Sequence, residues 1–398
     1  MDVVYLDPPY NTGSEVLTYA DDRRVEDWTE FMRARLEAAR ELLNDTGIIC
    51  VAIGDDGHHR IRHLMEEVFG AKTFLANIVW QGQKAGGTTT AGGVDYMVVH
   101  ARSGGHRPTW MEPKPGVAEA LEKARECWED ANGDQEAAEA LLRRWWNHDG
   151  RHYPRGLRDY TRLTQTGRLY RPGSLAAPDQ PERRSHRPLR HPLTGRACRV
   201  PSMGWRVSDA TMDALLARGL IEFGPDESVI PTRRYYLDEQ DRQKPAQVFY
   251  KPRRSNHVDN LLGGRRFPYP KDHTVLMRWL RMWAPNDGVI LDFFAGSGST
   301  LEAVLRLNAE DGGTRECILV SNNEVSADDQ KHLVANGHNP GDREWEARGV
   351  YERVTRPRIE AVLTGLRPDG SEHGIVMPGS VRFWHHHGTW SHTQRSRR

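Results

Sequence analysis

Residues 4–13, VYLDPPYNTG, bring together groups that could act on an amine. Two adjacent prolines, Pro8 and Pro9, hold their φ angles near −65°, which makes the turn stiff. The Asp7 carboxylate and the Pro8 carbonyl can then accept the two hydrogens of one exocyclic amine. Tyr10 offers a ring face for a base that has been pulled out of its stack. The segment therefore predicts chemistry on the amine of a nucleobase.

A plain structural role also fits this segment. Residues 2–6, DVVYL, are β-branched and aromatic, so they predict a short buried strand that the prolines would end. Asp7 would then cap the helix that follows. An isolated DPPY favours this structural interpretation, and the chemical one depends on what else the chain carries.

A second motif, ILDFFAGSGST at residues 290–300, lies nearly the whole chain away. Gly296 and Gly298 permit close backbone approach between a strand and a helix N-terminus, a turn that can hold a nucleoside cofactor. Glu324 follows the next predicted strand, where a carboxylate is placed to bind ribose hydroxyls. Glycines that serve packing alone are the alternative. The glycine turn and the carboxylate together favour the cofactor interpretation.

The elements that must position these motifs follow from the spacing of apolar residues. The pattern predicts strands at 2–6, 47–56, 74–80, 95–101, 288–294 and 316–322, and helices at 27–44, 58–69, 272–284 and 298–308. Strands that alternate with helices imply an α/β fold with a parallel-rich sheet whose faces are covered. Both motifs directly follow a predicted strand.

The middle of the chain has a different amino-acid composition. A helical stretch at 117–146 is first acidic and then basic, and residues 147–245 are rich in Arg, Pro and Gly. Residues 143–200 hold 14 arginines against four acidic residues, a local charge of +10, although the whole chain has a formal net charge of zero. Tyrosines and tryptophans are interleaved. A polyanion partner is predicted, with a solvated arginine-rich surface as the alternative.

The order of these motifs carries a family resemblance. LDPPYNTG, followed much later by FPYPK (267–271) and DFFAGSGST, resembles the β-class amino-methyltransferases of DNA. More narrowly, the chain is similar to the modification (Mod) subunits of type III restriction–modification systems. The resemblance runs through most of residues 1–365. It implies a Rossmann-like S-adenosylmethionine-dependent methyltransferase sheet, permuted so that the amine-binding motif precedes the cofactor motif.

The resemblance also implies a division of the chain. Residues 1–106 and 246–365 would form the two halves of the catalytic domain. Residues 107–245 would be an inserted target recognition domain that binds DNA, and residues 366–398 a tail.

Roles carry over by position. Asp7, Pro8 and Tyr10 would hold a flipped adenine, while Pro9 keeps their turn rigid. The residues implied for S-adenosylmethionine are Asp292, Phe294, Ala295, Gly296 and Gly298, with Glu324 for the ribose and Pro270 and Lys271 beside the methionine end. The implied reaction is methyl transfer from the sulfonium to N6 of adenine in duplex DNA. It needs no metal, because the leaving group is a neutral thioether. Cytosine-N4 enzymes usually carry Ser in place of Asp7, so that activity is the alternative.

The same resemblance suggests partners besides double-stranded DNA, namely a second copy of the chain and a restriction (helicase–nuclease) subunit. The start of the chain departs from the family. Met1 lies six residues before Asp7, where family members carry an earlier strand ending in a GDN-like turn. We therefore expect an N-terminally truncated member, and a catalytically impaired DNA-binding remnant is the alternative to an active enzyme.

Composition sets outer limits on these interpretations. No apolar run approaches the roughly 20 residues that cross a bilayer, so no membrane association is expected. The four cysteines are far apart and form no CxxC pair, which predicts neither a zinc site nor disulfides and fits a reducing cytoplasm.

Overall fold

The computed structural model describes residues 1–10, 25–82, 93–253 and 256–384. The last three residues of VYLDPPYNTG and residues 385–398 of the expected tail therefore lie outside the described residues. The chain divides into two compact units. One joins Met1–Trp110 to Ala246–Arg398, and the other is Met111–Pro245. Each unit is described by itself.

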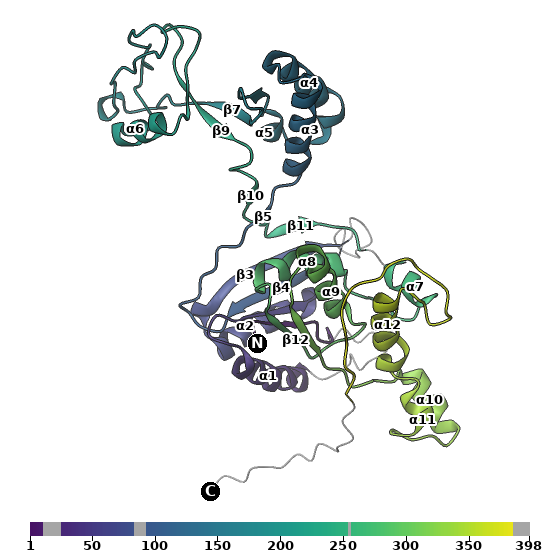
Figure 1. Cartoon of the computed structure of the whole chain (residues 1–398). Helices are drawn as coiled ribbons and strands as arrows, with labels where there is room; N and C mark the ends of the chain where they lie inside the picture. Colours follow the sequence, from purple (N-terminus) through teal and green to yellow (C-terminus); the bar gives the residue numbers. More distant parts are fainter. Residues whose placement is uncertain (11–24, 83–92, 254–255, 385–398) are drawn as a thin grey trace. The chain divides into compact units, whose positions relative to one another are not determined.

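A seven-stranded sheet forms the centre of the first unit (Figure 1). Its strand order is β11-β3-β4-β2-β1-β12-β13. The strands are β1 (Val3–Leu6), β2 (Ile48–Ile53), β3 (Phe74–Gln81), β4 (Val94–Ala101), β11 (Val248–Tyr250), β12 (Val289–Asp292) and β13 (Glu316–Leu319). All neighbours pair in parallel except β2 with β4 and β3 with β4, so the sheet is mixed but mostly parallel, as the sequence indicates.

Helices cover both faces of this sheet because its strands are apolar on both sides. Alternate residues of β1 enter two different cores, Val3 on one face and Val4 on the other. The Val3 side packs against α8 (His273–Trp283) and α9 (Ser299–Asp311). The Val4 side packs against α1 (Val25–Leu42) and α2 (Asp55–Phe69). The result is a three-layer α/β/α arrangement, the expected fold class.

Short elements complete this unit. The Asp272 side chain accepts a hydrogen bond from the backbone N–H of Thr274 at 2.8 Å, so it caps the start of α8. The remaining elements are η1 (Ala71–Thr73), α7 (Asn256–Leu262), α10 (Ala327–Ala335), α11 (Arg343–Glu346), the π-helical turn η4 (Tyr351–Thr355) and α12 (Arg356–Thr364).

The second unit has its own sheet and its own cores. The helical stretch at 117–146 is two helices, because Gly133 has φ +80° and Asp134 caps the second one. A four-stranded antiparallel sheet has the order β6-β7-β9-β8. The elements are β5 (Glu112–Pro113), α3 (Val117–Asp130), α4 (Gln135–Asn147), η2 (Asp149–His152), α5 (Arg155–Arg158), β6 (Arg162–Leu163), β7 (Leu169–Ser174), η3 (Pro181–Arg183), α6 (Asp209–Ala217), β8 (Ile221–Glu222), β9 (Thr232–Tyr236) and β10 (Arg242–Gln243).

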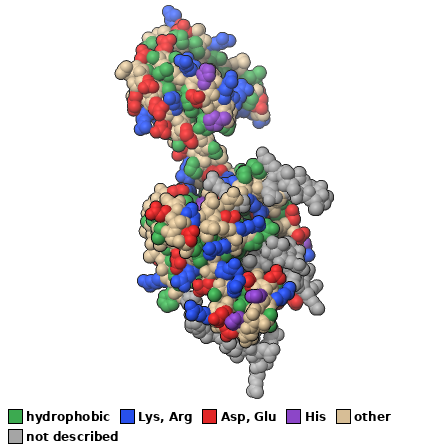
Figure 2. All heavy atoms as spheres, turned by 90° about the vertical axis from the view of Figure 1, so that its right-hand side faces the viewer, with side chains coloured by type: hydrophobic (Ala, Val, Ile, Leu, Met, Phe, Trp, Pro, Cys, Tyr) green, Lys and Arg blue, Asp and Glu red, His purple; other side chains and the backbone are tan. Residues whose placement is uncertain are grey.

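Many arginines of this unit have acidic partners. Six of the 14 arginines between 143 and 200 form ion pairs, namely Arg143, Arg162, Arg168, Arg184, Arg187 and Arg196. Basic and acidic side chains accordingly mix on the face of the unit that is visible in Figure 2. The local charge of +10 is therefore partly neutralised by acids from elsewhere in the same unit.

Within the described residues, no helix has both the length and the apolar character needed to cross a bilayer. All four cysteines are free thiols in the structure.

Candidate active site

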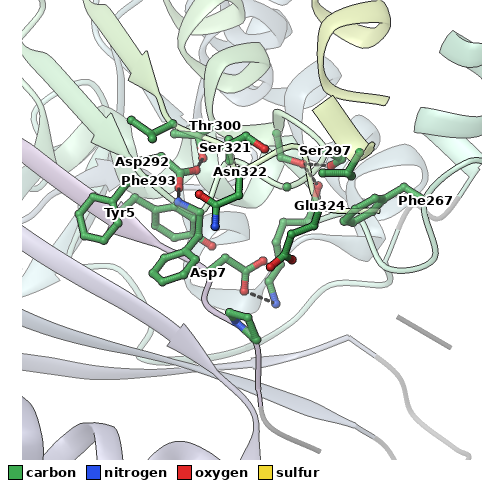
Figure 3. Close-up of a pocket in the computed structure, with 18 of the residues that line it drawn as sticks. Tyr5, Asp7, Phe267, Asp292, Phe293, Ser297, Thr300, Ser321, Asn322 and Glu324 are labelled. Atoms are coloured by element: carbon green, nitrogen blue, oxygen red, sulfur yellow. Dashed lines mark hydrogen bonds and ion pairs between the residues drawn. The ribbon is translucent and has the colours of Figure 1, made fainter. Parts of the chain in front are cut away.

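The two sequence motifs meet where the parallel strands β1 and β12 of the large sheet reach their carboxyl ends. Strands β1 and β12 are adjacent and parallel, with Val4 opposite Leu291. Their carboxyl ends therefore lie side by side, which brings Asp7 close to Asp292. A cavity of about 460 Å³ opens at the carboxyl ends of these strands. Figure 3 shows Asp7, which follows β1, facing the same space as Asn322 and Glu324 from the loop after β13.

Eight of the predicted site residues line this cavity. They are Asp7, Pro9, Lys271, Asp292, Phe294, Ala295, Gly296 and Glu324. Pro8, Tyr10, Gly298 and Pro270 are not among the described residues that form its wall. Pro8 is buried behind the turn, and Gly298 begins α9 with φ +80°.

Lys271 connects the two halves of the unit at the base of the cavity. Its Nζ lies 3.3 Å from Asp7 Oδ1 and 3.3 Å from a carboxylate that sequence reasoning missed, Asp95 Oδ2 on β4. The same ammonium donates to the Tyr10 hydroxyl, which lies 3.4 Å from Asp95 Oδ1. Arg253 donates to Asp95 at 2.7 Å. Two carboxylates and two cations therefore balance each other here.

Burial and this charge balance act on Asp7 in opposite directions. Desolvation raises the pKa of Asp7, while the nearby Lys271 charge lowers it and Asp95 raises it again. The net pKa is above the ordinary value, although a quarter of the side chain is still exposed. Within the described residues, Asp7 Oδ1 has the ion pair to Lys271 but no hydrogen-bond partner. The Oδ1 atom itself is buried, whereas the Asp7 side chain as a whole is a quarter exposed and lines the cavity.

Packing fixes the DPPY turn. The Trp28 indole N–H donates to the Pro9 carbonyl at 3.0 Å, which ties the turn to α1. Tyr10 lies against Gly54, where an added Cβ would be 2.9 Å from the Tyr10 ring. The turn is thus held from two sides, in addition to the stiffness of its prolines.

Asp292 is buried where β12 ends. Its Oδ2 accepts from the Thr300 hydroxyl at 2.5 Å and its Oδ1 from the Phe294 backbone N–H at 2.9 Å. Desolvation raises the pKa of Asp292 to about 7, although both hydrogen bonds lower it, and the Asp7 charge adds to the rise. The carboxyl group therefore fixes the geometry of the turn between β12 and α9 and changes charge near neutral pH.

The glycine-rich turn exposes backbone to the cavity. Gly296 has φ +49°, and an added Cβ would lie 3.6 Å from the Phe267 ring. The Gly298 N–H donates to the Ala295 carbonyl at 2.7 Å, and the Ala295 N–H donates to Val320 at 3.2 Å. Backbone and aromatic surface therefore approach the cavity closely, as a flat ligand would require.

Glu324 reaches the cavity from a loop, five residues beyond the end of β13 at Leu319. The preceding Asn323 has φ +53° and donates its side-chain amide to the Glu346 carboxylate at 2.7 Å. The Val350 N–H donates to the Glu324 carbonyl at 2.9 Å. These bonds to the segment before η4 hold Glu324 in place where the strand itself no longer does.

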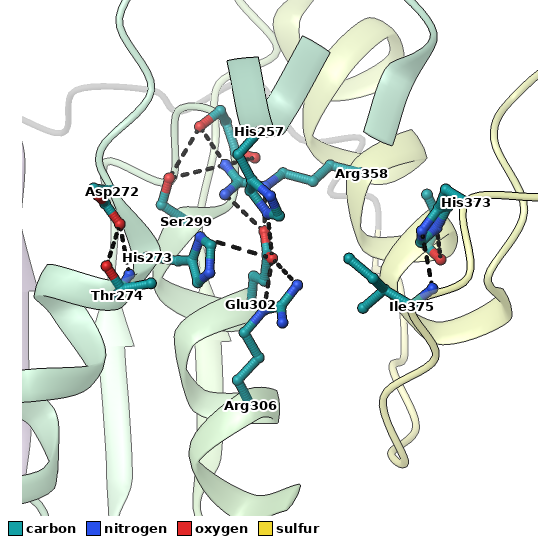
Figure 4. A network of polar contacts seen from close by, with 12 residues as sticks. His257, Asp272, His273, Thr274, Ser299, Glu302, Arg306, Arg358, His373 and Ile375 are labelled. Atoms are coloured by element: carbon teal, nitrogen blue, oxygen red, sulfur yellow. Dashed lines mark hydrogen bonds and ion pairs between the residues drawn. The ribbon is translucent and has the colours of Figure 1, made fainter. Parts of the chain in front are cut away.

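A buried charge network supports the glycine-rich turn from behind (Figure 4). Arg358 on α12 is 0% exposed and donates to the Ser297 carbonyl at 3.1 Å and to the Ser299 hydroxyl at 2.8 Å. It also pairs with Glu302 at 2.8 Å. Burial alone would raise the pKa of Glu302, but the Arg358 charge and a hydrogen bond from His257 hold it well below its usual range.

The same network contains a group with metal-ligand geometry. His257, His273 and Glu302 bring one ligand atom each to within 4.8 Å of one another. Arg306 and Arg358 also lie 2.8 Å from the Glu302 carboxylate. A divalent cation would meet both guanidinium charges there, so the cluster is better explained as a charge-compensated support for the turn.

Comparison with known proteins identifies the family. The family model described as DNA methylase (N6_N4_Mtase) matches residues 1–325. The chain belongs to this DNA methylase family. Similar proteins include the StyLTI Mod subunit of a type III restriction-modification enzyme from Salmonella typhimurium, 27% identical over 92% of this chain and 54% of the relative. The EcoPI Mod subunit from Escherichia phage P1 is 26% identical over 91% of this chain and 58% of the relative.

The chain therefore spans about half the length of the curated relatives it matches. Among solved structures, the PvuII DNA methyltransferase (cytosine-N4-specific) aligns with a TM-score of 0.38 at 10% identity. That alignment covers 89% of this chain and 85% of the solved one.

In this DNA methylase, sequence reasoning missed the residues that act through others. Asp95 is the single acid in a predicted apolar strand, DYMVVHA, and that isolated charge is the sequence signal that could have marked it. In the structure its side chain is buried, with 3% exposed. Arg358 and Glu302 look like ordinary helix charges. Their meeting depends on how α12 packs against α9, which the sequence does not show.

Proposed function

We propose that this DNA methylase transfers a methyl group from S-adenosylmethionine to N6 of a flipped adenine in duplex DNA. The observation that carries the proposal is the position of Asp7. Its carboxylate enters the same cavity as the glycine-rich turn after β12, although the two are nearly 290 residues apart in sequence. A polarised amine and a methyl donor would thus share one enclosed space.

The residues present fit S-adenosylmethionine. The cavity offers aromatic surface from Phe267 and Phe294 for an adenine ring, and the Glu324 carboxylate for ribose hydroxyls. Gly296 adds backbone without a side chain. When bound, this cofactor supplies an electrophilic methyl group on a sulfonium. Every other requirement of the reaction falls to the chain.

Asp7 acts on the amine. Its ionised carboxylate accepts one amine hydrogen. The resemblance assigns the other hydrogen to the Pro8 carbonyl, although Pro8 itself does not line the cavity. The nitrogen lone pair is then directed away from the ring. The Lys271 ammonium favours the ionised form of Asp7. After transfer, the methylated amine carries an extra proton, which the Asp7 carboxylate, part of a side chain that is a quarter exposed, can accept and pass to solvent.

The names of the relatives bear on the restriction partner. Several of the similar proteins are Mod subunits of type III restriction–modification enzymes. We propose that this chain is likewise a modification subunit that acts on duplex DNA, pairs with a second copy and associates with a restriction subunit. Light scattering of the purified chain, alone and with the restriction subunit, tests both associations.

The test of the activity is Asp7→Ala. Loss of the acceptor should reduce methylation at least about 100-fold, the cost of removing one group that stabilises the transition state. Mass spectrometry of hydrolysed duplex measures N6-methyladenine and N4-methylcytosine separately. The affinity for duplex and for S-adenosylmethionine should change little, which separates chemistry from binding.

Two outcomes would contradict the proposal. A wild-type chain that binds duplex but leaves every base unmethylated would be the DNA-binding remnant. Methylcytosine as the product would assign the cytosine-N4 activity instead.

A further inference from the structure

One face of the four-stranded sheet in Met111–Pro245 carries two arginines around a single tyrosine. Arg171 on β7 stands directly opposite Tyr235 on β9. Arg233 lies two residues before Tyr235 and therefore on the same face. The guanidinium carbons of Arg171 and Arg233 lie 4.8 Å and 4.6 Å from the Tyr235 ring centroid, within the range of cation–π contacts.

Gly173 makes this arrangement possible. It stands opposite Arg233 in the ladder, and a Cβ built at Gly173 would lie 2.3 Å from Tyr235 Cε2. The tyrosine ring therefore lies across β7 in the space that any other residue would fill. Because two cations share this ring, they are less than about 10 Å apart.

The opposite face of the same sheet is built differently. Arg162 there pairs with Glu139 and Glu222, and Arg168 pairs with Asp238 and Glu239. Arg234 on that face lies singly over the Tyr170 ring, 5.3 Å from its centroid. In the part of the chain that the structure describes, no carboxylate lies within 4.0 Å of Arg171 or Arg233. Two neighbouring guanidinium groups are thus held by an aromatic ring and left without a counter-charge.

We propose that Arg171, Tyr235 and Arg233 form a surface that binds the phosphate backbone of duplex DNA. The inference rests on the proposed function. The net charge of the unit does not say where phosphates would bind, whereas this arrangement assigns the phosphate contact to one face of the sheet. A guanidinium is a planar donor that matches phosphate oxygens bidentately. The ring fixes both groups before binding, so little side-chain entropy is lost when a phosphate arrives. Such contacts position the duplex and carry no sequence information.

The test compares two double variants of the full chain that remove the same charge. Arg171→Ala/Arg233→Ala empties the proposed surface. Arg184→Ala/Arg187→Ala removes two arginines of the same unit that are paired with Asp179 and Asp213. Fluorescence anisotropy with a labelled duplex of about 30 base pairs is measured over a series of salt concentrations.

The first variant should bind about 10- to 100-fold more weakly at moderate salt. The slope of log affinity against log salt should fall by about two, because each phosphate contact contributes about one. The control should keep the wild-type slope. Equal losses in both variants would mean that net charge alone acts, which would overturn the proposal.

Gly173→Ala tests the ring's position without removing a charge. Its Cβ must displace Tyr235, so it should weaken duplex binding, whereas Tyr235→Phe keeps the ring and should bind as the wild type does. S-adenosylmethionine binding by calorimetry should be unchanged in every variant. A wild-type chain that binds no duplex at all would contradict the proposed function itself, whereas unaffected variants of a duplex-binding chain would contradict this surface alone.

Discussion

At the scale of single residues, the site is organised by a lysine between two carboxylates. Lys271 Nζ lies 3.3 Å from both Asp7 and Asp95, and Arg253 balances Asp95 from the other side. Without these cations, burial and mutual repulsion would both favour protonation of Asp7. A protonated carboxyl has lost part of its capacity to accept an amine hydrogen. Lys271 therefore opposes the rise in the pKa of Asp7 that burial causes.

Asp292 yields a prediction about pH. Its pKa is about 7 in the folded chain against an ordinary value of 3.8, because it is buried. Between these values the folded state binds more protons than the unfolded state, so stability falls as pH rises. Asp292→Asn removes this dependence. From pH 5 to pH 8 the free energy of unfolding of the variant should rise by roughly 1–3 kcal/mol relative to that of the wild type, measured by thermal unfolding.

Asp311→Asn is the control for that measurement. Hydrogen bonding from Arg315 lowers the pKa of Asp311 below 3.8, so its contribution is fully present throughout pH 5–8. The difference in unfolding free energy between Asp311→Asn and the wild type should therefore stay constant from pH 5 to pH 8. A constant difference for Asp292→Asn as well would show that the buried carboxyl does not titrate there.

At the scale of elements, the decisive segment is the turn that joins β12 to α9. Gly298 has φ +80°, and an added Cβ would lie 3.4 Å from Thr355. Gly312 at the other end of α9 has φ +70° with open space around it. Alanine at either position should cost about 1 kcal/mol of unfolding free energy, because both require left-handed backbone.

Only Gly298→Ala should also weaken the binding of S-adenosylmethionine, since only that end of the helix forms the turn behind the cavity. Denaturant unfolding measures the stability of both variants, and calorimetry measures their affinity for the cofactor. The same loss of affinity in Gly312→Ala would assign the effect to general destabilisation.

The elements themselves were largely predictable. Apolar periodicity located the strands β1 to β4, β12 and β13 and the helices α1, α2, α8 and α9 to within a few residues. The mixed pairing was not predictable, because antiparallel β3 and β4 read as ordinary buried strands. The end of β13 was placed too late. Residues up to 322 were expected in the strand, yet the chain leaves it at Leu319 to present Glu324 from a loop.

The site was predictable where a motif fixes local geometry, as in DPPY and the glycine turn. It was not predictable where a side chain matters through a distant neighbour. Asp95 becomes important only because β4 brings it to Lys271, 176 residues later. Arg358 reaches Ser297 across 61 residues. Tertiary packing makes these contacts, and local sequence does not encode them.

At the scale of the whole molecule, the chain carries an inserted unit, Met111–Pro245, whose two ends are paired with each other. Strands β5 and β10 pair Pro113 with Arg242, so the two ends of Met111–Pro245 lie side by side. Two hydrophobic cores of this unit contain only its own residues. Both features are typical of a unit that folds alone.

Residues 111–245 expressed alone should therefore unfold in one cooperative thermal transition, followed by circular dichroism. They should also retain duplex binding with the salt dependence of the full chain, because the Arg171–Tyr235–Arg233 surface lies wholly within the unit. A fragment without a cooperative transition would show that its cores depend on the rest of the chain.

The position of β1 in the sheet has a consequence for synthesis on the ribosome. β1 is translated long before one of its two neighbours, β12, and the Val289 N–H donates to Asp2 across 287 residues. At about 5–20 residues per second, that partner arrives roughly 15–60 s later. One long side of β1 must wait unpaired for that time, an exposure that favours misassociation and chaperone contact. A newborn chain therefore cannot complete its cavity until the segment that carries Glu324 and Val350 has been made.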